Sequence, residues 1–126
     1  MMQYSAAPWR VLDAEHAGYC VEAGKLHLKY AEKIFALAEN AATTCEPIVR
    51  YLEYVFPGEG LEEINDQFML GDDLLVAPVM TKGAVTREVR LPGGKWRYVD
   101  GKVYDGGATI TVDAPISVLP HFEKID

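Results

Sequence analysis

Five acidic side chains near the middle of the chain are the first candidates for chemistry: Glu62, Glu63, Asp66, Asp72 and Asp73. A pair of carboxylates can supply a general acid and a general base, and several together can bind a hard cation. Local structure accounts for them more simply, because glutamates stabilise the first turn of a helix and paired aspartates favour a turn. No EF-hand spacing is present. We therefore expect a structural role and predict no metal site among these residues.

The other candidate nucleophiles and ligands are isolated from one another. His16, His27 and His121 do not have the spacing of zinc ligands. Neither serine, Ser5 or Ser117, lies in a GxSxG turn, and neither cysteine stands near a partnered histidine in the sequence. The glycine pairs match no phosphate-binding loop. The sequence therefore predicts no cofactor.

Aromatic side chains offer a different chemistry, the stacking of a pyranose ring on an aromatic face. Trp96 and Tyr98 alternate along a predicted strand, so both side chains face the same side of it. Trp9 lies in an irregular lead-in at the N-terminus. The same pattern is typical of residues that pack in a core or across strands. A sugar-binding platform and a packed core both remain open.

Charge and hydropathy exclude several classes of partner. The 126 residues carry a formal net charge of −7, and no cluster of Lys and Arg is available to neutralise phosphates or an anionic membrane. No apolar run reaches the roughly 20 residues that span a bilayer. The N-terminus has no signal-peptide pattern, which favours a cytoplasmic location. The two cysteines, Cys20 and Cys45, are expected to be buried free thiols.

The N-terminal half is predicted to be one long helix over residues 13–43, with Asp13 as its N-cap. Its apolar positions form two neighbouring stripes: Leu26, Tyr30, Ile34, Leu37 and Ala41 in one, and Leu28, Ala31, Phe35, Ala38 and Ala42 in the other. An apolar face this wide exceeds what a surface helix needs. We therefore expect self-association through the exposed part of this face.

The C-terminal half is predicted to consist of short strands. Residues 48–56 are typical of a strand, residues 61–70 of a short helix closed by Gly71, and residues 74–80 of a strand buried on both faces. Residues 85–91, 96–99, 102–104, 109–112 and 117–122 then form a meander, with a type I′ turn expected at Asp100-Gly101. The fold class is α+β, with an antiparallel sandwich after the helix.

Two runs in the middle of the chain resemble glycoside hydrolase family 31, which contains α-glucosidases and α-xylosidases. They are PIVRYLEYVFPGEG, from Pro47, and DQFMLGDDLLVAPV, from Asp66. The helix ending KIFALAENAATT and the segment after Val79 also resemble the family. The likeness covers almost the whole chain.

The resemblance implies that the chain is the C-terminal portion of a longer enzyme. Residues 1–71 would be the end of a (β/α)8 barrel, including a late helix and the last strand, and residues 72–126 an adjoining β-sandwich domain. The family cleaves α-glucosides and other oligosaccharides with two aspartates and retention of configuration. The motifs that carry these aspartates do not occur here, so we expect no catalytic residue and no hydrolysis by this chain alone. The alternative is a carbohydrate-binding or purely structural β-module.

Overall fold

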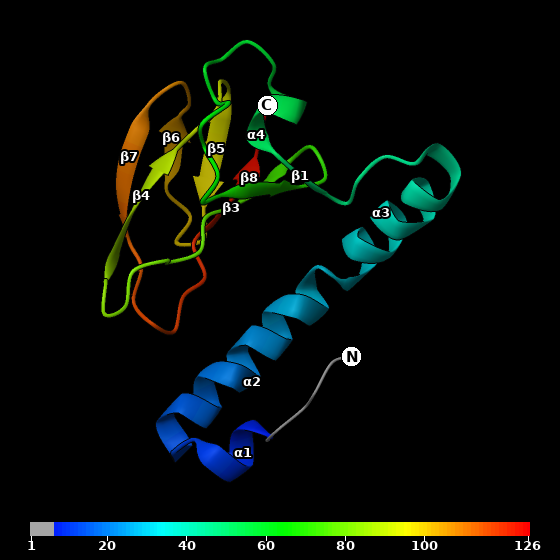
Figure 1. Cartoon of the computed structure of the whole chain (residues 1–126). Helices are drawn as coiled ribbons and strands as arrows, with labels where there is room; N and C mark the ends of the chain where they lie inside the picture. Colours follow the sequence, from blue (N-terminus) through cyan, green and yellow to red (C-terminus); the bar gives the residue numbers. More distant parts are fainter. Residues whose placement is uncertain (1–6) are drawn as a thin grey trace.

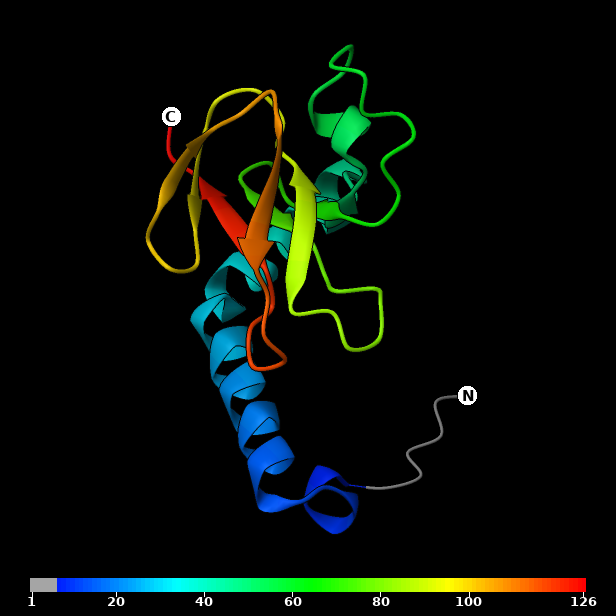
Figure 2. The ribbon, with the colours of Figure 1, turned by 90° about the vertical axis from the view of Figure 1, so that its left-hand side faces the viewer.

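The computed structural model describes residues 7–126 and shows a helical arm joined to a β-rich body (Figure 1). Four helices are α1 (Pro8–Val11), α2 (Ala14–Lys29), α3 (Ala31–Thr44) and α4 (Leu52–Val55). The strands are β1 (Val49–Arg50), β2 (Phe68–Leu70), β3 (Leu74–Val76), β4 (Thr86–Arg90), β5 (Lys95–Tyr98), β6 (Val103–Asp105), β7 (Thr109–Asp113) and β8 (His121–Lys124). Figure 2 shows that α2 reaches well beyond the body, toward the N-terminal end of the chain.

The predicted long helix is interrupted at Tyr30, where φ is −99° and ψ is 7°. Its start is as predicted, because the Asp13 side chain accepts a 2.9 Å hydrogen bond from the His16 amide. The prediction of one continuous helix is therefore wrong. At the far end, Cys45 closes α3 in the left-handed region, with φ of 63°.

The two predicted apolar stripes have different surroundings. The first stripe, which contains Leu26, Tyr30 and Ile34, is half-buried toward the strands. In the second stripe, Leu28 is 73% exposed and Phe35 is 65% exposed. The helix therefore uses one apolar face within this chain and leaves the other in water.

The strands form two antiparallel sheets that share one core. The larger sheet has the order β1-β2-β3-β8-β5-β6, and β4 pairs with β7 in the smaller one. The larger sheet contains strands from both sides of residue 71. Both sheets contribute side chains to the same cluster, which includes Met69, Leu75, Trp96 and Phe122 from one sheet and Val89 and Val112 from the other. The predicted antiparallel pairing is thus present, and the shared core holds the two sheets face to face.

Two predictions in the connecting segment are wrong. The strand expected over residues 48–56 stops after Arg50, because the chain turns into α4 and places Leu52 in the core with no exposed surface. The helix expected over residues 61–70 is absent, and its last three residues form β2, which pairs with β1 and β3. Pairing with distant strands overrides the local helical preference here.

Gln67 connects the two sheets through its side chain. Its amide nitrogen donates to the Arg90 carbonyl at 2.7 Å, and its amide oxygen accepts from the Arg90 backbone N–H at 3.0 Å. Gln67 is only 4% exposed. The Gln67 amide therefore makes the pair of hydrogen bonds that the backbone of a neighbouring strand would make, and it fixes the start of β2 against β4.

Two strands are shorter than predicted, and one turn differs in type. Of the strand expected over residues 74–80, only Leu74–Val76 forms, and the one expected over residues 117–122 begins at His121. Pro78 comes two residues after the first of these strands and Pro120 directly precedes the second, and proline cannot donate to a ladder. At Asp100-Gly101 only the glycine has positive φ. The Gly101 amide donates to the Tyr98 carbonyl and the Tyr98 amide to Lys102, which fits a three-residue loop with a glycine bulge instead of a type I′ turn.

Within residues 7–126, none of the helices combines the length and the apolar character that crossing a membrane would require.

Candidate functional site

The predicted acidic cluster does not converge on a common point. Three aspartates each pair with a different basic side chain: Asp66 with Arg87 at 2.7 Å, Asp72 with Arg50, and Asp73 with Lys33. Both glutamates, Glu62 and Glu63, are exposed in the loop before β2. The three aspartates therefore join segments of the fold, and none of them is free to act as a general acid or base.

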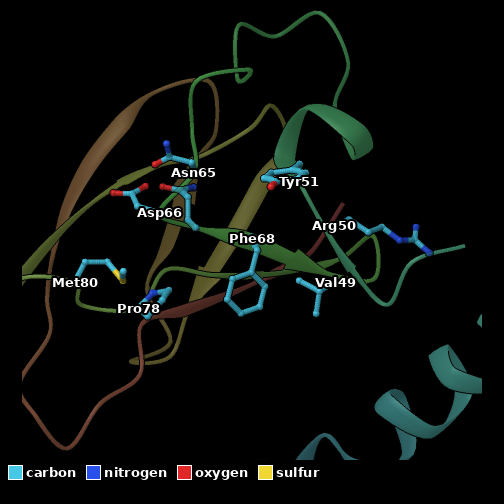
Figure 3. A pocket seen from close by; sticks show the side chains of 9 residues that line it. Val49, Arg50, Tyr51, Asn65, Asp66, Phe68, Pro78 and Met80 are labelled. Carbon is cyan, nitrogen blue, oxygen red and sulfur yellow. The ribbon is translucent and has the colours of Figure 1, made fainter.

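A hollow of about 420 Å³ lies beside β1 and β2 (Figure 3). Its lining combines apolar and polar side chains: Val49, Phe68, Pro78 and Met80 with Arg50, Tyr51, Asn65, Asp66 and Gln67. In Figure 3 the Arg50 side chain points away from the other labelled residues, toward its partner Asp72. The hollow therefore has an aromatic and acidic rim but receives no guanidinium from β1.

Asp66, on the rim of the hollow, is already engaged by Arg87. Arg87 donates to the backbone carbonyl of Asp66 at 2.9 Å and to that of Pro78 at 3.1 Å, besides pairing with the Asp66 carboxylate. No buried side-chain nitrogen or oxygen within the described residues lacks a hydrogen-bond partner. The buried polar side-chain atoms around the hollow are thus satisfied within the chain.

A second and larger depression of about 720 Å³ separates α2 from the larger sheet. Its walls are mostly apolar and include Leu26, Tyr30, Leu70, Val76, Ile116 and Val118, and it shares Phe68 and Pro78 with the hollow. We call this depression the groove. The hollow and the groove together make one apolar surface along β2 and β3, a feature that strand-by-strand sequence reasoning did not reveal.

Polar contacts hold the C-terminal end of α2 to β8 of the larger sheet, beside the groove. The Tyr30 hydroxyl donates to the Glu123 carboxylate at 2.7 Å, and Lys29 Nζ donates to the same oxygen at 3.1 Å. These two hydrogen bonds, with that from Tyr30 the stronger influence, lower the pKa of Glu123. The Tyr30 ring also meets the His121 ring edge-on, with centroids 5.7 Å apart.

The histidines are far from forming a metal site. His16 pairs with Asp13 at 2.8 Å, and this hydrogen bond raises the pKa of His16. His121 is buried with Nδ1 2.8 Å from the Leu119 carbonyl, and His27 lines the groove. Within residues 7–126, no three His, Cys, Asp or Glu side chains are placed to hold a metal ion.

The remaining sulfur and hydroxyl candidates have no catalytic setting. Both cysteines, Cys20 and Cys45, are free and exposed, so the prediction that they are buried is wrong. Ser117 lies among the groove residues, and Ser5 falls outside the described residues.

The sugar platform considered for β5 is not formed, because both aromatic side chains point into the core. Trp96 has no exposed surface and Tyr98 is 5% exposed. Trp96 Nε1 donates to the Pro92 carbonyl at 2.9 Å, and the Tyr98 hydroxyl donates to the Asp113 carbonyl at 2.6 Å. Burial raises the pKa of Tyr98 to about 12. The packed-core alternative is therefore the correct one.

Comparison with known proteins shows which protein family this chain belongs to. Residues 45–125 match the glycosyl hydrolase family 31 C-terminal domain. The chain belongs to glycosyl hydrolase family 31. The resemblance seen in the two central runs is thus confirmed.

Relatives within family 31 are several times longer than this chain. The myogenesis-regulating glycosidase of Mus musculus is 38% identical over 119 residues, which are 93% of this chain and 16% of that protein. A probable glucan 1,3-alpha-glucosidase of Arabidopsis thaliana is 38% identical over 104 residues, or 79% of this chain and 11% of that protein. The chain spans less than a fifth of either relative.

Solved family 31 structures contain the same fold. A GH31 dextranase from Flavobacterium johnsoniae, complexed with glucose, matches with a TM-score of 0.89 and 36% identity over 94% of this chain and 15% of its own. A GH31 alpha-xylosidase from a soil metagenome, complexed with xylose, matches with a TM-score of 0.89 and 28% identity over 96% of this chain and 18% of its own. These matches are too long to cover the β-rich body alone, so they include most of the helical arm.

Proposed function

We propose that this chain is the C-terminal, non-catalytic portion of a retaining α-glycosidase that acts on α-glucosides or α-xylosides in carbohydrate metabolism. The observation that carries the proposal is membership of family 31 combined with coverage of less than a fifth of its relatives. Retaining glycosidases need a carboxylate nucleophile and a second carboxylic acid across the scissile bond. In this chain Asp66, Asp72 and Asp73 are each held by a basic side chain, which supports a scaffold role for them.

The substrate class in the proposal comes from the relatives. They include glucosidases, a dextranase solved with isomaltotriose and an alpha-xylosidase solved with xylose. Those structures contain sugars bound to intact enzymes. We propose that an oligosaccharide or α-glucoside is likewise bound by the intact protein, through residues outside this chain.

The physical role that we propose is to complete and support a catalytic barrel. In this proposal residues 1–71 are the end of the barrel domain, with α2 and α3 as a late helix and β1 as the last strand, and residues 72–126 are the adjoining β-domain. A barrel strand needs neighbours on both sides, and within residues 7–126 β1 has only β2 beside it. The apolar hollow and groove would be covered by the rest of the barrel.

The first test asks whether the isolated chain hydrolyses anything. Purified chain is incubated with aryl α-glucosides and aryl α-xylosides, and release of the aryl group is followed. We expect no turnover above that of buffer. Hydrolysis that disappears in Asp66→Asn or Asp73→Asn would overturn the proposal, because it would place the catalytic carboxylates in this chain.

The second test asks whether the chain can serve as the C-terminal portion of an active enzyme. The matching segment of the Flavobacterium johnsoniae dextranase is replaced by residues 7–126, and dextran hydrolysis is measured beside a variant that lacks the segment. We expect the chimaera to hydrolyse dextran and the deletion variant to be inactive. A chimaera that folds and binds isomaltotriose but does not hydrolyse dextran would contradict a purely supporting role.

A further inference from the structure

The core of the β-rich body is complete without the helical arm. The arm comprises α1, α2 and α3, and the body comprises residues 46–126. The buried hydrophobic cluster begins at Leu52, ends at Phe122 and includes Trp96, and these three side chains have no exposed surface. Within the described residues, no side chain of α1, α2 or α3 is buried. The body therefore closes its core with its own residues, whatever else packs on the arm.

Polar side chains on exposed positions join the arm to the body. The Tyr30 hydroxyl and Lys29 Nζ donate to Glu123, and Lys33 pairs with Asp73. The side chains of Lys29 and Asp73 are each 59% exposed. Exposed ion pairs contribute little to stability, because water and salt screen them. Most of what these contacts provide is thus the hydrogen bond from Tyr30.

Apolar contact between the arm and the body is local. A methyl group of Leu37 lies close to Gly71, in the turn between β2 and β3. Along α2, the groove of about 720 Å³ separates the helix from the larger sheet, and Leu26 and Leu70 are on its walls. The arm therefore docks at the end of α2 and in α3, without a continuous apolar interface.

The connection between the arm and the body has a defined break at Cys45. This residue ends α3 with a left-handed φ of 63°. The two residues after it are bound to the body, since Glu46 accepts a 2.6 Å hydrogen bond from the Tyr54 hydroxyl and the Pro47 carbonyl accepts one of 2.7 Å from Arg50 Nε. A rotation about Cys45 would thus move the arm and leave these bonds intact.

We infer that the helical arm is a releasable unit, which detaches from the body at Cys45 while the body stays folded. Helices α2 and α3 have 16 and 14 residues, and isolated helices of this length are marginal in water. Their backbone amides therefore exchange with solvent whenever the arm is released, whereas amides of the body exchange only when the body unfolds. The inference uses contacts within this chain only, so it does not depend on the proposed function.

Ala38→Pro tests whether the body stays folded without a docked arm. Proline in the middle of α3 removes a helical hydrogen bond and breaks the helix, and Ala38 is exposed, so the body loses no contact of this side chain. Hydrogen exchange of the full chain is followed at each amide by NMR. We expect the amides of α3 to lose protection and those of β3, β5 and β8 to keep it. Body amides that exchange as fast as those of an unfolded chain overturn the inference.

Val89→Ala is the reciprocal test, because it weakens the body at a fully buried position of the smaller sheet. Removing the equivalent of two methylene groups should lower the protection of body amides roughly tenfold. The amides of α2 and α3 should keep their protection, since the body is folded both before and after release of the arm. An equal fall in arm and body overturns the inference, because it shows a single cooperative unit.

Tyr30→Phe tests the contact that holds the arm. The variant removes the hydroxyl that bonds Glu123 and keeps the ring. Loss of one hydrogen bond should lower the protection of α2 and α3 amides roughly fivefold. Unchanged protection of the arm in this variant overturns the assignment of Tyr30 as the docking contact.

Discussion

The hydroxyl of Tyr30 donates a 2.7 Å hydrogen bond to the carboxylate of Glu123, 93 positions later in the chain. Tyr30 is also the residue at which the helical arm is interrupted, and Glu123 lies in β8, in the middle of the larger sheet. Lys29 joins the same carboxylate. The arm and the body therefore meet at a specific polar contact flanked by apolar packing.

Tyr30→Phe should lower the free energy of unfolding by about 1 kcal/mol, the usual contribution of one hydrogen bond. The ring and its edge-on contact with His121 remain, so the change isolates the hydroxyl. Urea denaturation followed by circular dichroism measures the loss. Tyr19→Phe is the matched control, because its hydroxyl bonds Glu15 within α2 on an exposed surface. An equal loss of stability in Tyr19→Phe would show that the Tyr30–Glu123 hydrogen bond stabilises the fold no more than an exposed hydrogen bond within one helix.

The same contact predicts how stability changes in acid. Hydrogen bonds from Tyr30 and Lys29 lower the pKa of Glu123 below its ordinary value of 4.5. A carboxyl with a lowered folded pKa stabilises the protein fully above its unfolded pKa, and this contribution is lost as the pH falls through the folded pKa. Glu123→Gln should therefore be less stable than the wild type at neutral pH, and the difference should shrink below pH 4.5. Urea midpoints across this range test it; a difference that does not change with pH would contradict the assignment.

Trp96→Ala should remove about 3–5 kcal/mol of stability, because it empties the largest fully buried side chain of the core. That loss is a large part of the total stability of a domain of this size, so we expect a chain that unfolds at low urea or is largely unfolded. Trp9→Ala deletes the same atoms from a side chain that is 78% exposed, and should change the urea midpoint little. Similar midpoints for the two variants would show that Trp96 is not in the core.

Gly71→Ala should cost about 1–2 kcal/mol for the left-handed backbone alone, because φ is 68° in the turn between β2 and β3. A further cost arises because the new Cβ would lie 3.0 Å from a methyl group of Leu37. Gly83→Ala has a similar φ of 78° with no atom within 4 Å of the new Cβ, so it carries the backbone cost only. Thermal or urea unfolding of both variants measures the difference, and a larger loss at Gly83 would argue against packing of α3 on this turn.

Short-range patterns predicted much of the fold. Alternation over residues 85–91 located β4 and its buried Val89, and paired turn residues located the loop between β5 and β6. These features depend on neighbours in sequence, which is the information that periodicity contains. Helical periodicity likewise located the two apolar stripes of the arm, although it did not distinguish the stripe that meets the strands from the exposed one.

Long-range contacts account for what the sequence did not predict. Residues 61–70 have the composition of a helix. Their extended conformation depends instead on long-range contacts such as the hydrogen bond from Gln67 to the backbone of Arg90, 23 residues away. The role of Asp73 depends on Lys33, 40 residues earlier. The inward direction of Trp96 depends on which face of β5 the second sheet covers. No local pattern contains these facts, so the acidic cluster and the aromatic pair could not be assigned from sequence alone.

The two hydrogen bonds between Gln67 and Arg90 also affect the tendency of the chain to aggregate with other copies of itself. β4 pairs with β7 on one side only, and a strand with a free side is a template onto which another molecule can add a strand and begin to aggregate. The backbone N–H and carbonyl of Arg90 point to that free side, and the Gln67 amide occupies both. The Gln67 side chain thus blocks this edge, and Gln67→Ala would leave the Arg90 N–H and carbonyl free to pair with another strand.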